Sequence, residues 1–216
     1  MLDGAGHVLT PGLLDIHNHG GAGASYGERR RRQSVRLGNS TATRHYSSAA
    51  LAGRGVPDVL ILGDSGRGSR NPARPTIMGS TSRSVLAREY CGAHDPTLLR
   101  DPDPALVERL LAAADGTLRQ VTMARAGSFR RVGADPARRG RVVVAVGHTA
   151  ATFEQARAAI EAGASLLTHT FNGMPGVHHR APGPVLAFVE NPDGWLEVVN
   201  DGIHVRSEVI PDGSVS

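Results

Sequence analysis

Apolar residues recur in short runs, and several of these runs end in polar side chains. Residues 8–19 (VLTPGLLDIHNH) are apolar before they reach two histidines, which predicts a buried strand at about 13–17. The β-branched and apolar stretches 117–123 and 142–147 predict two more strands, and the run at 195–199 predicts another. The pattern therefore indicates buried strands that deliver His, Asp or Asn at their carboxyl ends.

Helical patterns lie between some of these runs. Residues 103–115 begin with Asp103 as a candidate N-cap and Pro104 at the first helical position, which predicts a helix. The Ala-rich segment 152–162 ends at Gly163 and predicts a second helix, between the strand before it and the run LLT after it. This order is a strand–helix–strand unit.

Repeated units of this kind are typical of a parallel α/β sheet. Polar side chains at successive strand ends are typical of a (β/α) barrel, whose site lies at the carboxyl ends of its strands. We therefore expect the α/β class, as an incomplete TIM-type barrel. The length of 216 residues favours a single domain, residues 1–216.

Residues 27–88 have a different composition from the rest of the chain. All basic residues are arginine, and this tract holds twelve of them against three acidic residues. It shows neither the helical nor the strand period, except at 57–63 (PDVLILG), so we expect it to be poorly ordered. Residues 124–141 resemble it over a shorter length.

Other features of the composition exclude whole classes of protein. No run approaches the ~18–20 apolar residues of a membrane-spanning helix, and the sequence after Met1 does not read as a secretory signal, so we expect a cytoplasmic protein. Cys91 is the one cysteine, which rules out an internal disulfide and a cysteine zinc site. A metal would need histidines and carboxylates.

Four histidines follow predicted strands and are candidate metal ligands. His17 and His19 stand two apart, so both imidazoles project from one face of a strand. His148 follows VVVAVG and His169 follows LLT. A bare His-x-His pair is a weak signal and is more often a surface or core feature. Four histidines at three strand ends favour convergence on one cation.

Two further groups have weaker signals. His178, His179 and Arg180 occupy a loop, where Arg180 could bind a phosphate or carboxylate, or could belong to a solvated basic loop. Asp201 and His204 follow the last predicted strand, where Asp201 alone is more typical of a turn former.

Four segments together carry a family resemblance: residues 9–23 (LTPGLLDIHNHGGAG), 91–96 (CGAHDP), 144–184 (VAVGHT through HHRAPGP) and 199–205 (VNDGIHV). They resemble successive signatures of the N-acetylglucosamine-6-phosphate deacetylases, of the amidohydrolase superfamily. The resemblance covers about half of the chain, and the 144–184 segment is its most specific part.

The resemblance implies a metal-dependent barrel of the amidohydrolase kind, usually attached to a small β-sandwich, of which residues 1–8 would be a remnant. It implies hydrolysis of the acetamide of N-acetylglucosamine 6-phosphate to glucosamine 6-phosphate and acetate, with one or two divalent cations such as zinc, iron or cobalt. His148 and His169 would bind one cation, and His17 and His19 would help bind a second. It also suggests a homodimer and no membrane partner.

The same resemblance implies the residues of the substrate pocket. Backbone or amide groups would line the sugar site, Arg180 would bind the phosphate, and two residues of the DGIH segment would complete the pocket. The implied set is Ala93, Asn172, Gly173, Arg180, Asp201 and His204.

Two departures from the family pattern bear on activity. The family's glutamate ligand is absent, because its place holds serine and threonine around Ser82. The family's catalytic aspartate lies on a strand beyond the DGIH segment, so no catalytic residue is assigned and we expect an impaired enzyme. Residues 27–88 could be coding sequence read out of frame or a genuine arginine-rich insertion, and translation of the other two frames would distinguish them.

Two alternatives to a deacetylase stay open from sequence. The pI of about 10.1 and the run RRRR at 29–32 could mark an arginine-rich nucleic-acid-binding protein. Against this, the charge is concentrated in one tract, without interleaved aromatic residues. The chain could also be an inert relic of the deacetylase.

Overall fold

The fold is described from a computed structural model. It describes residues 14–18, 20–21, 24–25, 46–52, 76–92, 94, 99, 105, 108–109, 111–112, 118–124 and 142–210.

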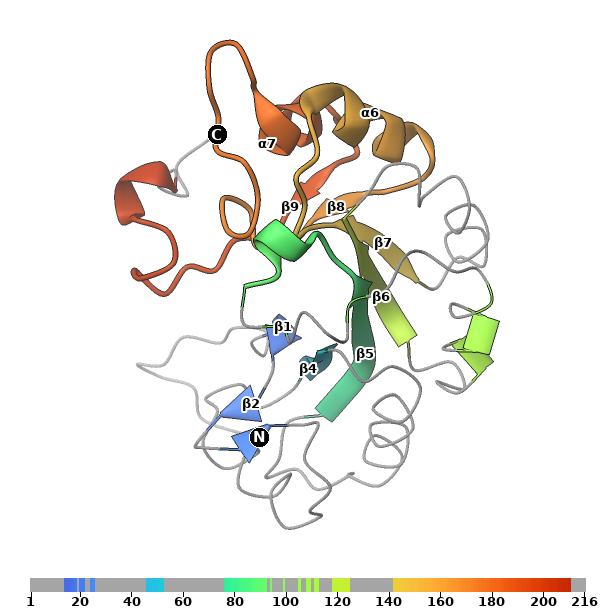
Figure 1. The fold of residues 1–216 in the computed structure, drawn as a ribbon. Coiled ribbons are helices and arrows are strands. Elements are labelled where there is room, and N and C mark those ends of the chain that lie inside the picture. The colour runs from blue at the N-terminus through green and yellow to red at the C-terminus, as the bar shows by residue number, and fades with distance from the viewer. Residues whose placement is uncertain are drawn as a thin grey trace, which may run out of the picture.

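Seven strands form one parallel sheet, in which each strand pairs with the next one along the chain (Figure 1). This order is that of a barrel built from successive strand–crossover units, and it confirms the expected α/β class and incomplete barrel. A separate antiparallel pair joins β2 (Gly20–Gly21) to β3 (Ala24–Ser25). The seven strands are β1 (Leu14–Asn18), β4 (Tyr46–Ala52), β5 (Thr76–Val85), β6 (Leu118–Met123), β7 (Val143–Val146), β8 (Leu166–Leu167) and β9 (Trp195–Leu196).

Two helices make the crossovers between the last three strands. Helix α6 (Phe153–Glu161) connects β7 to β8, and α7 (Gly183–Val189) connects β8 to β9. Both lie on the outside of the sheet, next to each other (Figure 1). A short 3-10 helix, η1 (Arg88–Tyr90), follows β5, and a second, η3 (Ser207–Val209), lies near the end of the described residues.

The core lies between the sheet and these helices. Val144, Val146 and Leu167 from adjacent strands and Phe188 from α7 are each at most 1% exposed. Burial of such side chains stabilises a fold by about 1.5–3 kcal/mol each. The core therefore fixes the carboxyl ends of β7 and β8, from which two candidate ligands project.

The observed elements agree closely with the predicted ones in the second half of the chain. The predicted strand at 117–123 begins one residue before the observed one and ends with it, and the strand at 142–147 and the helix at 152–162 each extend one residue beyond the observed bounds at both ends. The run at 195–199 is a strand only over Trp195–Leu196. In the predicted helix 103–115, the described residues are helical.

Two strands fall within the arginine-rich tract, at places where the sequence shows no strand period. Its residues 46–52 and 76–85 form β4 and β5. These Ser-, Thr- and Ala-rich strands lack hydrophobic alternation, and they are specified by backbone pairing on both sides, β4 with β1 and β5, and β5 with β4 and β6. Residues 1–8, 57–63 and 125–141 lie outside the described residues. Within the described part, no helix is long and apolar enough to cross a membrane.

Candidate functional site

Four histidine rings lie next to one another at the carboxyl ends of the strands. The ring centroids of His148 and His169 are 4.3 Å apart, those of His148 and His94 are 4.8 Å apart, and those of His169 and His17 are 5.9 Å apart. These residues come from four separate segments of the chain. The fold therefore gathers imidazoles where a parallel barrel places its active site.

His148 lies two residues after the end of β7, in a strained backbone conformation. Its φ is +45°, in the left-handed region that non-glycine residues rarely adopt. The backbone is held from two sides, because Ala87 N donates to His148 O at 2.8 Å and the ring Nδ1 lies 2.7 Å from Tyr90 O. Such strain persists only where surrounding contacts determine it, and it is concentrated at functional sites.

His169 repeats this arrangement after β8. Its φ is +34°, and its Nδ1 lies 2.7 Å from the backbone oxygen of Asn172. A carbonyl can only accept, so Nδ1 must carry the proton in both His148 and His169. In a neutral ring the lone pair is then on Nε2, which is buried in each. This is the tautomer in which histidine binds a metal through Nε2.

Gly173 closes the site beside both rings. Its φ is +61°, and a Cβ there would lie 3.2 Å from Nδ1 of His148 and 3.4 Å from Cε1 of His169. Its backbone oxygen accepts a hydrogen bond from Thr149 N at 3.0 Å, which ties the two loops together. A glycine here lets the backbone approach the imidazoles closely.

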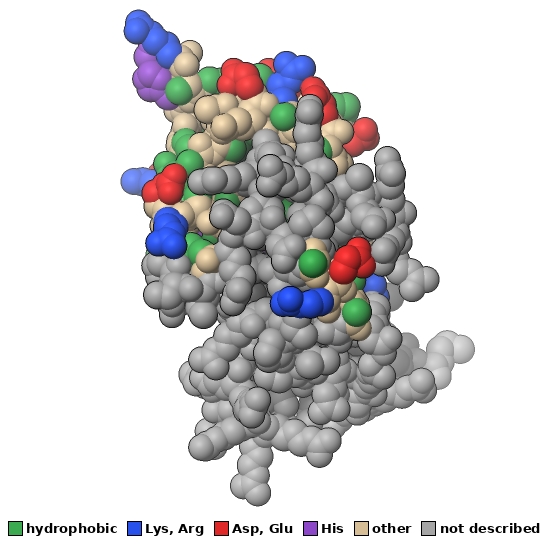
Figure 2. Space-filling view, turned by 45° about the vertical axis from the view of Figure 1, so that its right-hand side comes forward, with side chains coloured by type: hydrophobic (Ala, Val, Ile, Leu, Met, Phe, Trp, Pro, Cys, Tyr) green, Lys and Arg blue, Asp and Glu red, His purple; other side chains and the backbone are tan. Residues whose placement is uncertain are grey.

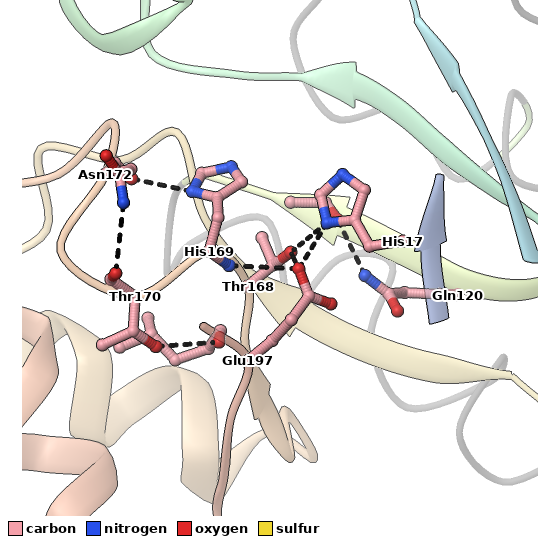
Figure 3. A network of polar contacts seen from close by, with 9 residues as sticks. His17, Gln120, Thr168, His169, Thr170, Asn172 and Glu197 are labelled. Carbon is pink, nitrogen blue, oxygen red and sulfur yellow. Dashed lines mark hydrogen bonds and ion pairs between the residues drawn. The ribbon is translucent and has the colours of Figure 1, made fainter. Parts of the chain in front are cut away.

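Glu197 provides a buried carboxylate at the centre of the site (Figure 3). Its Oε1 accepts hydrogen bonds from His17 Nδ1, from Thr168 Oγ1 at 2.6 Å and from the backbone N of His169 at 3.2 Å. Burial alone would raise the pKa of Glu197, but these hydrogen bonds and the nearby His17 lower that pKa to about 2. Glu197 is therefore ionised at neutral pH.

The contact between His17 and Glu197 joins the two ends of the sheet. His17 belongs to β1, one edge strand, and Glu197 follows β9, the other edge strand. Because a flat sheet of seven strands would separate its edges widely, this contact requires a strongly curled sheet. The second oxygen, Oε2, is also buried and accepts no hydrogen bond from the residues that the structure describes.

Of the other predicted site residues, some contact the clustered histidines and others do not. Asn172 holds His169 through its backbone oxygen, while its side-chain amide lies 3.4 Å from Thr170 O. Arg180 is exposed, and its backbone N donates to the ring of His178. Ala93 and His19 lie outside the described residues.

Asp201 and His204 contact each other in an exposed loop. Oδ1 of Asp201 accepts from the backbone N of Ile203 and of His204, at 2.9 and 2.8 Å, and Oδ2 lies 2.7 Å from His204 Nδ1. These hydrogen bonds, those of the backbone first, lower the pKa of Asp201 to about 2. Asp201 is thus a turn former that also orients the His204 ring.

The donor set fits part of a metal site. His148 and His169 present neighbouring rings in the metal-binding tautomer. Among the described residues, no three His, Cys, Asp or Glu side chains are grouped closely enough to hold an ion. The two imidazoles therefore fit a cation for which these residues supply no third ligand.

Sequence reasoning missed two members of this cluster. Glu197 lies in an apolar run, WLEVV. A charged residue within a predicted buried strand is the sequence feature that could have identified it as a site residue. His94 lies in the segment CGAHDP, which was singled out for Ala93 alone. Its ring packs edge-on against that of His148.

On the face shown in Figure 2, arginine side chains lie among acidic ones over the part of the chain that the structure describes. Nothing on it supports the nucleic-acid alternative.

The fold and site together define a parallel α/β barrel protein with a histidine-rich centre at its strand ends. No protein-family model matches the chain. Among known proteins, an N-acetylgalactosamine-6-phosphate deacetylase of Escherichia coli O157:H7 is 32% identical, over 92% of this chain and 54% of its own length. An N-acetylglucosamine-6-phosphate deacetylase of Vibrio furnissii is 28% identical, over 94% of this chain and 52% of its own length.

Solved structures agree with this result. The N-acetyl-D-glucosamine-6-phosphate deacetylase of Mycobacterium smegmatis is 37% identical, with a TM-score of 0.79, over 92% of this chain and 53% of its own. A point mutant of that enzyme, solved in complex with N-acetyl-D-glucosamine-6-phosphate, gives a TM-score of 0.80 at 36% identity. The expected resemblance is confirmed: this chain is a relative of the N-acetylglucosamine-6-phosphate deacetylases and their galactosamine counterpart. It spans about half the length of the relatives it matches.

Proposed function

We propose that this chain carries the metal-binding half of a site for hydrolysis of the acetamide of N-acetylglucosamine 6-phosphate. The observation that supports it most directly is the pair His148 and His169, with rings 4.3 Å apart and both Nδ1 atoms directed to backbone oxygens. The similarity to the deacetylases supports the same reaction. The strands from β1 to β9 that pair in parallel belong to a single sheet. We therefore also propose that residues 1–216 form one partial barrel domain.

In this proposal, Nε2 of His148 and Nε2 of His169 hold a divalent cation, and His17 and His19 serve a second one. Such a cation lowers the pKa of a bound water and polarises the amide carbonyl, as amide hydrolysis at neutral pH requires. The carbonyl oxygens of Tyr90 and Asn172 keep the two ligand rings in the correct tautomer. Gly173 leaves room beside them.

The proposed substrate contacts follow the family resemblance. Ala93, Asn172 and Gly173 contact the sugar, and the exposed guanidinium of Arg180 binds the phosphate by bidentate hydrogen bonds. Asp201 and His204 complete the pocket through the His204 ring, which Asp201 orients. Since a galactosamine deacetylase is also a relative, both sugar phosphates are candidate substrates.

Metal binding by the purified chain tests the proposal. In a zinc or cobalt titration, His148→Ala and His169→Ala should each abolish binding at this site, because each removes one of the two described ligands of the first cation. His179→Ala, at an exposed loop residue, is the matched control and should bind as the wild type does. Unchanged metal binding in both site variants would exclude the proposed site.

A further inference from the structure

Glu197 is the one buried carboxylate among the described residues, and the proposed reaction has not used it. Its backbone is fixed on both sides, because Glu197 N donates to Leu167 O at 2.9 Å and Glu197 O accepts from Thr170 N at 2.7 Å. Its side chain therefore projects from a rigid position next to the proposed ligand His169. A charge in such a position is costly unless it is paired and hydrogen-bonded.

Three donors converge on Oε1 of this carboxylate. They are the ring Nδ1 of His17, the hydroxyl of Thr168 and the backbone N of His169 (Figure 3). The Thr168 hydroxyl also lies 3.5 Å from His17 Nδ1. A carboxylate only accepts, so this contact requires the proton of His17 to be on Nδ1. Nε2 of a neutral His17 ring then carries the lone pair.

We propose that Glu197 is a positioning residue that fixes the tautomer and orientation of His17, so that the lone pair of the His17 ring lies on Nε2, the atom that would bind the proposed metal. Carboxylate–histidine pairs of this kind orient metal ligands and raise their basicity. This inference rests on the proposed function for its metal. The hydrogen bond itself is independent of the metal.

The arrangement also explains how distant strands contribute to one centre. His17 reaches the site from β1 and Glu197 from the end of β9, the two edges of the sheet. The hydrogen bond from His17 Nδ1 to Oε1 of Glu197 therefore links β1 to the segment that follows β9. The same oxygen fixes the backbone of His169, which couples the two proposed ligands through one carboxylate.

The test measures zinc or cobalt affinity of the full chain in Glu197→Gln, which keeps the side-chain length and removes the charge. We expect affinity to fall about 10- to 100-fold. The same substitution in a His17→Ala background should cause little further loss, because the amide oxygen of glutamine can still accept the hydrogen bond from the backbone N of His169. Glu190→Gln, at an exposed glutamate, is the matched control and should leave affinity unchanged. Wild-type affinity in Glu197→Gln, or an equal loss in both backgrounds, would overturn the proposal.

A second readout separates this inference from the proposed function. The ¹⁵N chemical shifts of metal-free protein report the tautomer of each histidine. His17 should be protonated on Nδ1 in the wild type and should become a mixture of tautomers in Glu197→Gln, while His148 and His169 keep theirs. If wild-type protein binds no metal, the proposed function fails, and these shifts still decide the role of Glu197. An unchanged His17 tautomer in the variant contradicts that role.

Discussion

At the scale of single residues, the site depends on backbone conformations with positive φ, which cost conformational energy in residues that carry a Cβ atom. His148 and His169 both adopt positive φ, and Gly147 and Gly173 lie beside them where a Cβ would meet neighbouring atoms. The ring of His148 is held by the backbone oxygen of Tyr90 from another loop, and that of His169 by the backbone oxygen of Asn172 in its own loop. The site is therefore organised before any ligand binds.

The tight packing at Gly147 gives a prediction about stability. A Cβ there would lie 2.2 Å from Cγ2 of Thr168 and 3.2 Å from Cγ2 of Thr122, two fully buried side chains. Gly147→Ala should lower the free energy of unfolding by about 1–3 kcal/mol through overpacking, as measured by urea denaturation.

Gly176→Ala is the control for this substitution. No described atom lies within 4 Å of a Cβ at Gly176. The variant should unfold within about 0.5 kcal/mol of the wild type. Equal stability of the two alanine variants would contradict the packing around Gly147.

At the scale of elements, α6 and α7 support the strand ends that carry the site. Helix α6 begins at Thr152 with a capping box, in which the Thr152 hydroxyl accepts from Gln155 N at 3.3 Å and the Gln155 side chain accepts from Thr152 N at 3.0 Å. This N-cap lies four residues after His148. The capped first turn of α6 therefore fixes the position of the short segment that connects His148 to the helix.

Removal of the cap should destabilise the protein. Thr152→Ala leaves the backbone N of Gln155 without its acceptor, so we expect a loss of about 1 kcal/mol in the free energy of unfolding. Thr152→Ser keeps a hydroxyl and should lose much less. A chemical denaturation series of the three proteins measures both, and an alanine variant as stable as the serine variant would argue against the cap.

Helix α7 contributes the largest fully buried side chain of the described core, that of Phe188. Phe188→Ala should cost about 3–5 kcal/mol, because it leaves a cavity between the helix and the sheet. Trp195→Ala is a useful contrast, since Trp195 on β9 is 73% exposed and should change stability by about 0.5 kcal/mol or less. Thermal or urea unfolding of both variants compares them, and a similar loss in each would mean that burial does not determine the difference.

At the scale of the whole molecule, the described residues assemble one half of what the reaction requires. The proposed metal has two imidazoles in the described site, and the place of the family's glutamate ligand holds Ser82 on β5. Among the described residues, no third side chain is close enough to complete a metal site. The 216-residue chain is therefore expected to bind metal weakly and to turn over slowly.

Because the described site lacks a third metal ligand, we expect the 216-residue chain to have very low deacetylase activity. With added zinc or cobalt, release of acetate from N-acetylglucosamine 6-phosphate should be barely above the rate without protein. His148→Ala should abolish what remains. Turnover near the ~10 s⁻¹ that is ordinary for enzymes would show that another carboxylate, such as Glu89 or Asp212, completes the site.

The sequence by itself determined the fold class and the positions of the two main candidate ligands. Apolar runs that alternate with helical segments specify a parallel sheet, and parallel strands bring their carboxyl ends to one edge, so His148 and His169 could be placed together from spacing alone. The strands at 46–52 and 76–85 could not be predicted, because they carry no hydrophobic period and owe their form to the strands on either side.

Only the tertiary structure decided that Glu197 belongs to the site. Which face of a short edge strand points inward, and whether the two edges of a sheet meet, depend on the curl of the whole sheet rather than on any local pattern. The tautomer of the His148 ring is likewise set by the backbone oxygen of Tyr90, which the fold brings up from another loop. Contacts between residues as distant as His17 and Glu197 leave no local pattern in a single sequence.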